Sequence, residues 1–320
     1  MRILSGIQPS GKLHIGNYFG MMKPALSLQH EGDAYLFIAN YHALTSVTDG
    51  AQLRQATLDV ALDFLASGLD PEKTVFFRQS DVPEVTELTW LLSTVTPMGL
   101  LERCHSYKDK IAKGIASSHA LFSYPVLMAA DILAVQSNIV PVGRDQKQHV
   151  EVTRDIALKF NQRFGEIFTL PEPSIQETVA VVPGINGQKM SKSYDNHIEL
   201  FGSPKATKKR VMQIVTDSTP LEAPKDPSHC NVFALYRLFT TETEQAELAE
   251  KYRLGGFGYG DAKKALLAVM DRELAPLRER REALARDLDF VEDVLREGAH
   301  KARAVARETL DQARAATGLA

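Results

Sequence analysis

Two short clusters of residues could do chemistry, and the first contains His14 and Asn17. They stand three positions apart where the sequence predicts the start of a helix, so they share one helix face. Gly16 lies between them and lets a ligand approach the backbone closely. A helix N-terminus also supplies unpaired N–H groups and a partial positive charge. This cluster favours a cradle for a nucleotide, although a lone histidine such as His14 is more often a packing residue.

The second cluster runs from Gly187 to Ser193 and reads Gly-Gln-Lys-Met-Ser-Lys-Ser. It follows the turn signals Pro183-Gly184 and Asn186-Gly187, which predict a loop. Two ammonium groups on a loop can neutralise a departing pyrophosphate, because positioned charge is the main catalytic device of phosphate chemistry. A solvated lysine loop without a function is the alternative.

A third pattern, from Gly6 to Leu13, matches the G-x-x-x-x-G-K of a phosphate-binding loop. That loop needs Ser or Thr at the next position, because the hydroxyl binds Mg²⁺. Leu13 stands there and has no hydroxyl. The pattern therefore disfavours a P-loop NTPase or kinase, and a plain Gly/Pro turn remains open for this segment alone.

Alternating strand and helix patterns must position these clusters. Apolar runs predict strands at 2–7, 34–39, 74–77 and 139–142, and helical patterns fill 16–30, 51–66 and 145–160, with Asp49 as a cap. Strands separated by helices indicate a parallel sheet with helices on both faces. We therefore expect an α/β domain of the Rossmann type over residues 1–195.

Beyond residue 196 the pattern is mostly helical, which predicts a smaller all-helical domain at 196–290. Helices are expected at 261–285, beginning at an Asp261 cap and interrupted or kinked at Pro276, and then at 288–297 and 301–316, separated at Gly298. The last helix, about 291–320, is expected to pack back on the first domain. Trp90, on an apolar helix, is interpreted as a core residue.

Composition narrows the class of protein. The chain has 320 residues, 44% hydrophobic and 24% charged, with a formal net charge of −3. These values are typical of a globular protein and exclude a disordered or fibrous chain. No apolar stretch is long enough to span a membrane, and no signal peptide is predicted. Two distant cysteines, Cys104 and Cys230, give no metal site and indicate a reducing, cytoplasmic location.

Both clusters resemble the signatures of class I aminoacyl-tRNA synthetases. His14-Ile15-Gly16-Asn17 is similar to the first signature, with Asn17 in place of its second histidine, and 189–193 is the intact second signature. The segments 5–11, 124–133 and 140–151 are similar to the branch of this family that is specific for tryptophan. Leu4 departs from this branch, where many members carry Phe, and so does the segment 181–187. The resemblance covers essentially the whole chain.

The resemblance implies a tryptophan–tRNA ligase. Such an enzyme activates L-tryptophan with ATP and Mg²⁺ to tryptophanyl-adenylate, and then transfers the tryptophanyl group to the 3′-terminal adenosine of tRNA(Trp). It implies a homodimer, and it implies an anticodon-recognising role for the helical domain. The basic run Lys205, Lys208, Lys209 and Arg210 is either a tRNA contact or a solvated helix face.

The resemblance also implies roles for single residues. The catalytic group would be His14, Asn17, Lys189 and Lys192, with Lys110 as a further cation. The ATP site would comprise Gln8, Pro9, Ser10, Gly16, Asn17, Gly143, Arg144, Asp145, Val182, Lys189, Met190, Ser191, Lys192 and Ser193. Tryptophan would be bound by His42, Tyr124, Met128, Asp131, Ile132, Val140, Val142 and Gln146, with Asp131 accepting from the indole N–H.

One further rival remains, a non-catalytic RNA-binding or regulatory relative. Such relatives often lose one of the two signatures. This chain keeps Lys189, Ser191, Lys192 and Ser193, which favours an active enzyme.

Overall fold

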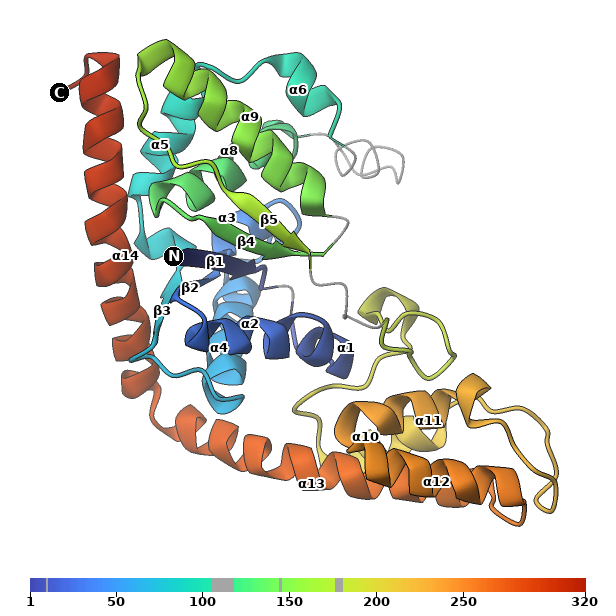
Figure 1. Ribbon diagram of the computed structural model, residues 1–320. Helices are drawn as coiled ribbons and strands as arrows, with labels where there is room; N and C mark the ends of the chain where they lie inside the picture. Colours follow the sequence, from blue (N-terminus) through green and yellow to red (C-terminus); the bar gives the residue numbers. More distant parts are fainter. Residues whose placement is uncertain (10, 105–117, 144–145, 176–180) are drawn as a thin grey trace.

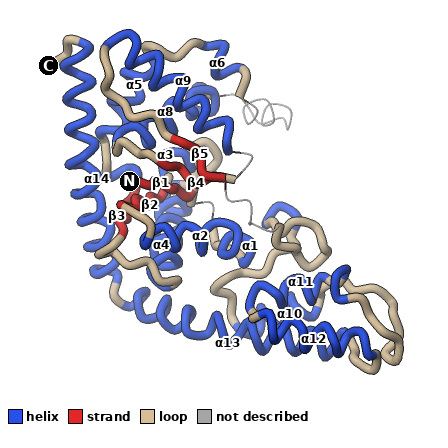
Figure 2. The backbone as a smooth tube through the Cα atoms, viewed as in Figure 1, coloured by secondary structure: helices blue, strands red, loops and turns tan. Residues whose placement is uncertain are grey.

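The computed structural model describes residues 1–9, 11–104, 118–143, 146–175 and 181–320 (Figure 1). Within these ranges the core is a parallel sheet of five strands, in the order β3-β2-β1-β4-β5. Figure 2 shows the strands gathered in one half of the molecule, whereas the other half consists of helices and loops. The prediction of a parallel α/β domain followed by a helical region is confirmed.

The strands are β1 (Arg2–Ile7), β2 (Asp33–Ile38), β3 (Thr74–Arg78), β4 (Ile139–Val142) and β5 (Glu172–Ile175). The helices of the sheet domain are α1 (Ile15–Asn17), α2 (Lys23–Ser27), α3 (Asn40–Ala43), α4 (Gly50–Ala66), α5 (Glu84–Ser93), α6 (Met98–Glu102), α8 (His119–Ala134) and α9 (Lys147–Phe164). The remaining helices are α10 (Pro204–Met212), α11 (Asn231–Tyr236), α12 (Glu242–Leu254), α13 (Tyr259–Arg286) and α14 (Leu288–Thr317).

The strand order of the sheet reverses between β1 and β4, and these two strands are paired over a short stretch. The two strands pair in register only at Ile3 and Ile139, near their amino ends. Further along β4, Pro141 has no N–H to donate, so it could not extend the ladder toward β1. Open α/β sheets bind ligands at such a switch point, outside the carboxyl ends of the strands.

Helix α14 lies along the β3 side of the sheet (Figure 1). The prediction of a break at Gly298 is wrong, because α14 is continuous from Leu288 to Thr317. Gly298 has a packing reason instead. A Cβ at this position would stand 1.9 Å from the carbonyl oxygen of Phe76, so only glycine lets the helix approach β3 this closely.

Three other details differ from expectation. Trp90 is 71% exposed, so its interpretation as a core residue is wrong. Helix α13 begins at Tyr259 after Gly258 as N-cap, and it continues through Pro276 to Arg286, so Asp261 lies in its first turn. Strand β5 was not expected, because its sequence Glu-Pro-Ser-Ile has no apolar run. It exists as an edge strand paired with β4, where a proline is tolerated.

The helices were also compared with the requirements of a membrane crossing. None of those in the described ranges combines the necessary length with the necessary apolar character.

Candidate active site

The first cluster forms a compact cap at the start of α1. The Nδ1 atom of His14 accepts a hydrogen bond from the backbone N–H of Asn17 at 3.2 Å, and Asn17 Oδ1 accepts from the backbone N–H of His14 at 3.0 Å. Because Nδ1 is an acceptor, the neutral ring carries its proton on Nε2. Burial lowers the pKa of His14 to about 4, with the charge of Lys192 adding to the effect. At neutral pH His14 is therefore an uncharged hydrogen-bond donor.

The two clusters, 174 residues apart at their contact, touch each other. The backbone N–H of Gly16 donates to Met190 Sδ at 3.3 Å. A Cβ on Gly16 would lie 3.0 Å from the His14 ring and 3.2 Å from Met190 Cβ, so a larger residue would fit here only if these neighbours moved. Around the contact, Ile15 N–H donates to Ile198 and Leu200 N–H donates to Leu13. The chain thus brings both candidate phosphate-binding segments to one place.

Lys192 lies over the loop that precedes His14. A Cβ at Gly11, a residue with φ of +96°, would stand 3.6 Å from Lys192 Nζ. Partial burial lowers the pKa of the Lys192 ammonium. Lys189 is exposed on the same loop. Leu13 is buried in the core, which agrees with the argument against a P-loop.

Asn196 holds the second cluster together, and no sequence pattern predicted this role. Its side chain is 1% exposed. Its Oδ1 accepts from Ser191 N–H at 2.7 Å, and its Nδ2 donates to the Lys189 carbonyl at 3.1 Å and to Asn186 Oδ1 at 2.8 Å. One buried amide therefore fixes the backbone on both sides of Met190. The Val182 carbonyl accepts a hydrogen bond from Met190 N–H. The ATP contact of Val182 stays a prediction.

A cavity of about 450 Å³ opens at the switch point of the sheet. All eight residues predicted to bind the amino acid line it, together with Gln8 and Gly143 from the predicted ATP set. The sequence reading had left other lining residues without a role: Ser5, Gly6, Met21, Phe37, Ala39, Thr45, Pro141 and His149. Tyr124 OH and His149 Nε2 lie 2.7 Å apart at one side of this cavity.

Asp131 brings a buried carboxylate to the cavity wall. It lies on α8 with Met128 and Ile132, and it is 5% exposed. His42 Nε2 lies 2.9 Å from Asp131 Oδ2, and Gln79 Nε2 donates to Oδ1 and Oδ2 at 2.8 and 2.9 Å. The Asp131 carboxylate is therefore an oriented acceptor in a cavity with a mixed apolar and polar lining, as recognition of a ring N–H requires.

Four predicted site residues, Ser10, Lys110, Arg144 and Asp145, lie outside the described residues. For three others the structure gives only contacts within the chain. Pro9 is buried, Ser193 donates its N–H to Ser191 Oγ, and Gln8 Nε2 donates to the His42 carbonyl.

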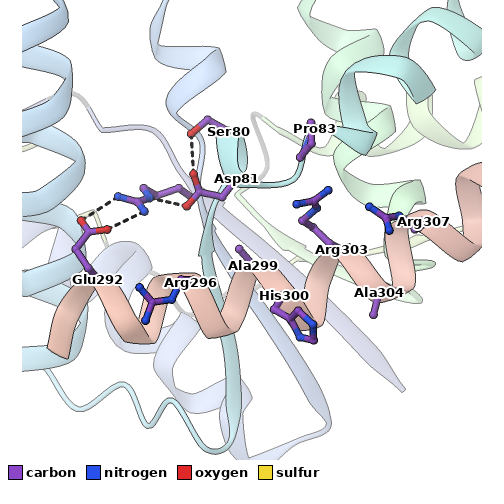
Figure 3. Close-up of a pocket in the computed structure, with 11 residues that line it drawn as sticks. Ser80, Asp81, Pro83, Glu292, Arg296, Ala299, His300, Arg303, Ala304 and Arg307 are labelled. Carbon is purple, nitrogen blue, oxygen red and sulfur yellow. Dashed lines mark hydrogen bonds and ion pairs between the residues drawn. The ribbon is translucent and has the colours of Figure 1, made fainter. Parts of the chain in front are cut away.

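A larger groove, of about 810 Å³, lies between α14 and the turn after β3 (Figure 3). Several of its charged groups are paired with one another or with neighbours. Arg78 contacts Asp81 and Glu292, and Arg303 and Arg307 both contact the buried Glu84. None of the residues of the two clusters lines it. These ion pairs attach α14 to the sheet domain, so the groove is not the reactive centre.

Comparison with known proteins agrees with this geometry. Residues 1–275 match the model of the family described as tRNA synthetases class I (W and Y). A tryptophan–tRNA ligase of Fusobacterium nucleatum is 57% identical over 99% of this chain and 98% of its own length. One from Rhodopirellula baltica is 55% identical over the full length of both. The crystal structure of Campylobacter jejuni tryptophanyl-tRNA synthetase complexed with ADP and tryptophan has a TM-score of 0.96 and 54% identity, covering 100% of both chains.

Proposed function

The chain belongs to the class I tRNA synthetases for tryptophan and tyrosine, and within this family we infer that it is a tryptophan–tRNA ligase. It activates L-tryptophan with ATP and transfers the tryptophanyl group to tRNA(Trp). The observation that carries this choice of amino acid is the cavity at the switch point, with Asp131 as a buried acceptor among Met128, Ile132, Val140 and Val142. Tryptophan is the one aromatic amino acid whose ring carries an N–H that only donates.

The first reaction joins the tryptophan carboxylate to the α-phosphorus of ATP. The bond from that phosphorus to the bridging oxygen breaks, and pyrophosphate leaves with the electron pair. In our proposal Lys189 and Lys192 neutralise the charge that develops on the leaving group. His14 donates from Nε2 to a phosphate oxygen, and the NH₂ end of the Asn17 side chain donates to ATP. Mg²⁺ enters with ATP as part of the substrate.

The remaining ATP and tryptophan contacts are proposed on the same basis, namely that the chain is a tryptophan–tRNA ligase. Gln8, Gly16 and Gly143 bind the nucleotide, with Pro9, Ser10, Arg144, Asp145 and Val182 completing its site. Tyr124 and Gln146 hold the amino or carboxylate end of tryptophan, and His42 lines the indole pocket beside Asp131. Support comes from the fact that Gln8, Gly143 and Gln146 line one cavity with the indole-pocket residues.

Residues 196–290 are proposed to recognise the tRNA anticodon. Lys205, Lys208 and Lys209 are exposed on α10 and available to phosphates. Arg210 is not equivalent, because its Nε donates to the His197 carbonyl at 2.9 Å and its guanidinium pairs with Asp195. We therefore assign Arg210 to support of the second cluster and restrict the tRNA contact to the lysines.

A homodimer and a cytoplasmic location complete the proposal. Trp90 on α5 and Met98 on α6 are 71% and 63% exposed, and we propose that both belong to the dimer interface. Sedimentation of wild-type protein is expected to give a dimer mass, and Trp90→Glu is expected to give a monomer. A dimer that survives Trp90→Glu would place the interface elsewhere. Because Trp90 is the single tryptophan of the chain, its fluorescence reports on the same equilibrium.

Exchange of pyrophosphate into ATP, measured with each of the twenty amino acids, tests the function. Fast exchange is expected with tryptophan alone. Equal exchange with tyrosine would move the chain to the other branch of the family. Hydrolysis of ATP to ADP and phosphate without any pyrophosphate exchange would favour a nucleotide hydrolase or kinase. A chain that binds tRNA(Trp) without exchange would be the non-catalytic relative. Transfer of labelled tryptophan to tRNA(Trp) tests the second reaction.

A further inference from the structure

Gln79 lies directly behind Asp131 and has no role in the scheme above. It follows β3 and begins the short helical turn Gln79–Asp81. Its side chain is fully buried. Its Nε2 atom contacts both carboxylate oxygens of Asp131, at 2.8 and 2.9 Å.

The orientation of the Gln79 amide is fixed by a second contact. The backbone N–H of Tyr41 donates to Gln79 Oε1 at 3.0 Å. A backbone N–H can only donate, so this end of the amide must be the oxygen and the NH₂ end must face Asp131. Gln79 therefore presents donors to the carboxylate, and the amide cannot be reversed without losing both contacts.

The turn that carries Gln79 is itself anchored. Asn40 Nδ2 donates to Ser80 Oγ at 2.7 Å, and Ser80 N–H donates to Asn40 Oδ1 at 3.0 Å. These bonds join the end of β2 to the end of β3. Gln79 is thus held by neighbours that do not line the tryptophan cavity, and it can fix Asp131 from behind.

Counting acceptor positions shows what this contact leaves open. An ionised carboxylate has about four lone-pair positions. Among the described residues, His42 and Gln79 use two on Oδ2 of Asp131, and Gln79 uses one on Oδ1. One position on Oδ1 remains, and its direction depends on the plane of the carboxylate.

We infer that Gln79 is a positioning residue that fixes the plane of the Asp131 carboxylate, so that its remaining acceptor position faces the indole N–H. This inference rests on the proposed function and deepens it. Gln79 would then set the selectivity for tryptophan over rings that lack the N–H, without touching the substrate.

The test compares tryptophan with 3-benzothienylalanine, in which sulfur replaces the indole N–H. Gln79→Met keeps an unbranched side chain of similar length and removes the donors. We expect kcat/KM for tryptophan to fall about tenfold, which corresponds to one hydrogen bond of ~1.4 kcal/mol. For the benzothienyl analogue we expect a change of less than about threefold, because no N–H is available to be misaligned.

Gln29→Met is the matched control. Gln29 also bridges two segments, donating to the Gly68 carbonyl and accepting from Asp70 N–H, but it does not contact Asp131. We expect it to leave the ratio of the two substrates unchanged. Equal losses for both substrates in Gln79→Met would show a merely structural role and overturn the inference.

Gln79→Glu gives a second, independent measurement. It keeps the size of the side chain but replaces the NH₂ donors with a carboxylate that faces Asp131, so we expect a larger loss of kcat/KM for tryptophan than for the benzothienyl analogue. Equal losses for the two substrates would contradict the inference. Wild-type protein without tryptophan-dependent exchange would overturn the proposed function and this inference together, whereas wild-type exchange with an unaltered substrate ratio in both variants overturns this inference alone.

Discussion

The cavity at the switch point of the sheet and the loop that carries the second cluster are held in place in different ways. The cavity takes its polar group from α8 and fixes it with Gln79 and His42, two side chains anchored on other elements. The loop from Val182 to Asn196 has a three-residue helical turn, and it is held by backbone hydrogen bonds such as Met190 to Val182 and by the buried amide of Asn196. It also contains positive φ values at Gly187 (+83°) and Asp195 (+45°).

This difference matches the two tasks. Selecting one amino acid requires an acceptor whose direction is fixed before the ligand arrives. Neutralising a leaving pyrophosphate requires cations near a charge that moves during the reaction. We therefore expect changes in the cavity to alter selectivity, and changes in the loop to alter rate.

Lys192→Ala should give the largest effect and should separate the two regions. We expect adenylate formation to slow by about 10²–10³-fold, as for removal of one contact to developing charge. The Kd of tryptophan should stay unchanged, because the cavity does not include Lys192. Single-turnover kinetics with Lys205→Ala as control check this. A normal chemical step with a weakened tryptophan Kd would reverse the assignment of the two regions.

Asp131→Ala should give the complementary result. We expect kcat/KM for tryptophan to fall at least about tenfold, or ~1.4 kcal/mol. The preference over phenylalanine should narrow, because the buried acceptor that phenylalanine leaves unpaired has been removed. Activation kinetics with both amino acids check this, with the exposed Asp155→Ala as control. Wild-type discrimination in Asp131→Ala would place the N–H acceptor elsewhere.

The double variant Lys208→Glu and Lys209→Glu should affect neither the cavity nor the loop. We expect weaker tRNA binding and a log–log salt slope reduced by about 1 to 2, because fewer counterions are released. Pyrophosphate exchange should be unaltered. Lys159→Glu on α9 serves as the control for a general charge effect. An unchanged tRNA affinity and slope would show that these lysines are a solvated helix face.

The smallest expected effect is the contribution of His14 to the pH dependence of stability, because the charge of His14 does not change near neutral pH. With the pKa of His14 at about 4 in the folded chain and 6.5 in the unfolded chain, the unfolded state takes up a proton first as the pH falls. The contribution of His14 to stability is therefore complete above about pH 6.5 and is lost as the pH falls toward 4. NMR titration of labelled histidines checks this directly. A His14 signal that titrates near 6.5 would contradict it.

The elements with regular patterns were predictable from the sequence, and the contacts between turns were not. The apolar runs gave β1 to β4, and Asp49 caps α4 as expected. The prediction for Trp90 was wrong because the sequence of an apolar helix does not show which of its faces is buried. Gln79 and Asn196 are polar residues outside the longer helices and the strands. Gln79 contacts Asp131, which lies 52 residues away. Asn196 contacts residues within ten positions of it, such as Asn186. The cavity residues came from family resemblance, since strand ends distant in sequence meet only once the sheet has formed.

The close contact between Gly298 and β3 can form only late in the synthesis of the chain on the ribosome. The edge of β3 and the helix that lies on it are separated by more than 200 residues of chain. At about 5–20 residues per second, a ribosome needs about 10 to 45 s to synthesise that interval. During this time the outer edge of the sheet has no α14 beside it, and uncovered strand edges pair readily with other chains. The nascent sheet domain is therefore a predicted client of ribosome-associated chaperones until α14 emerges.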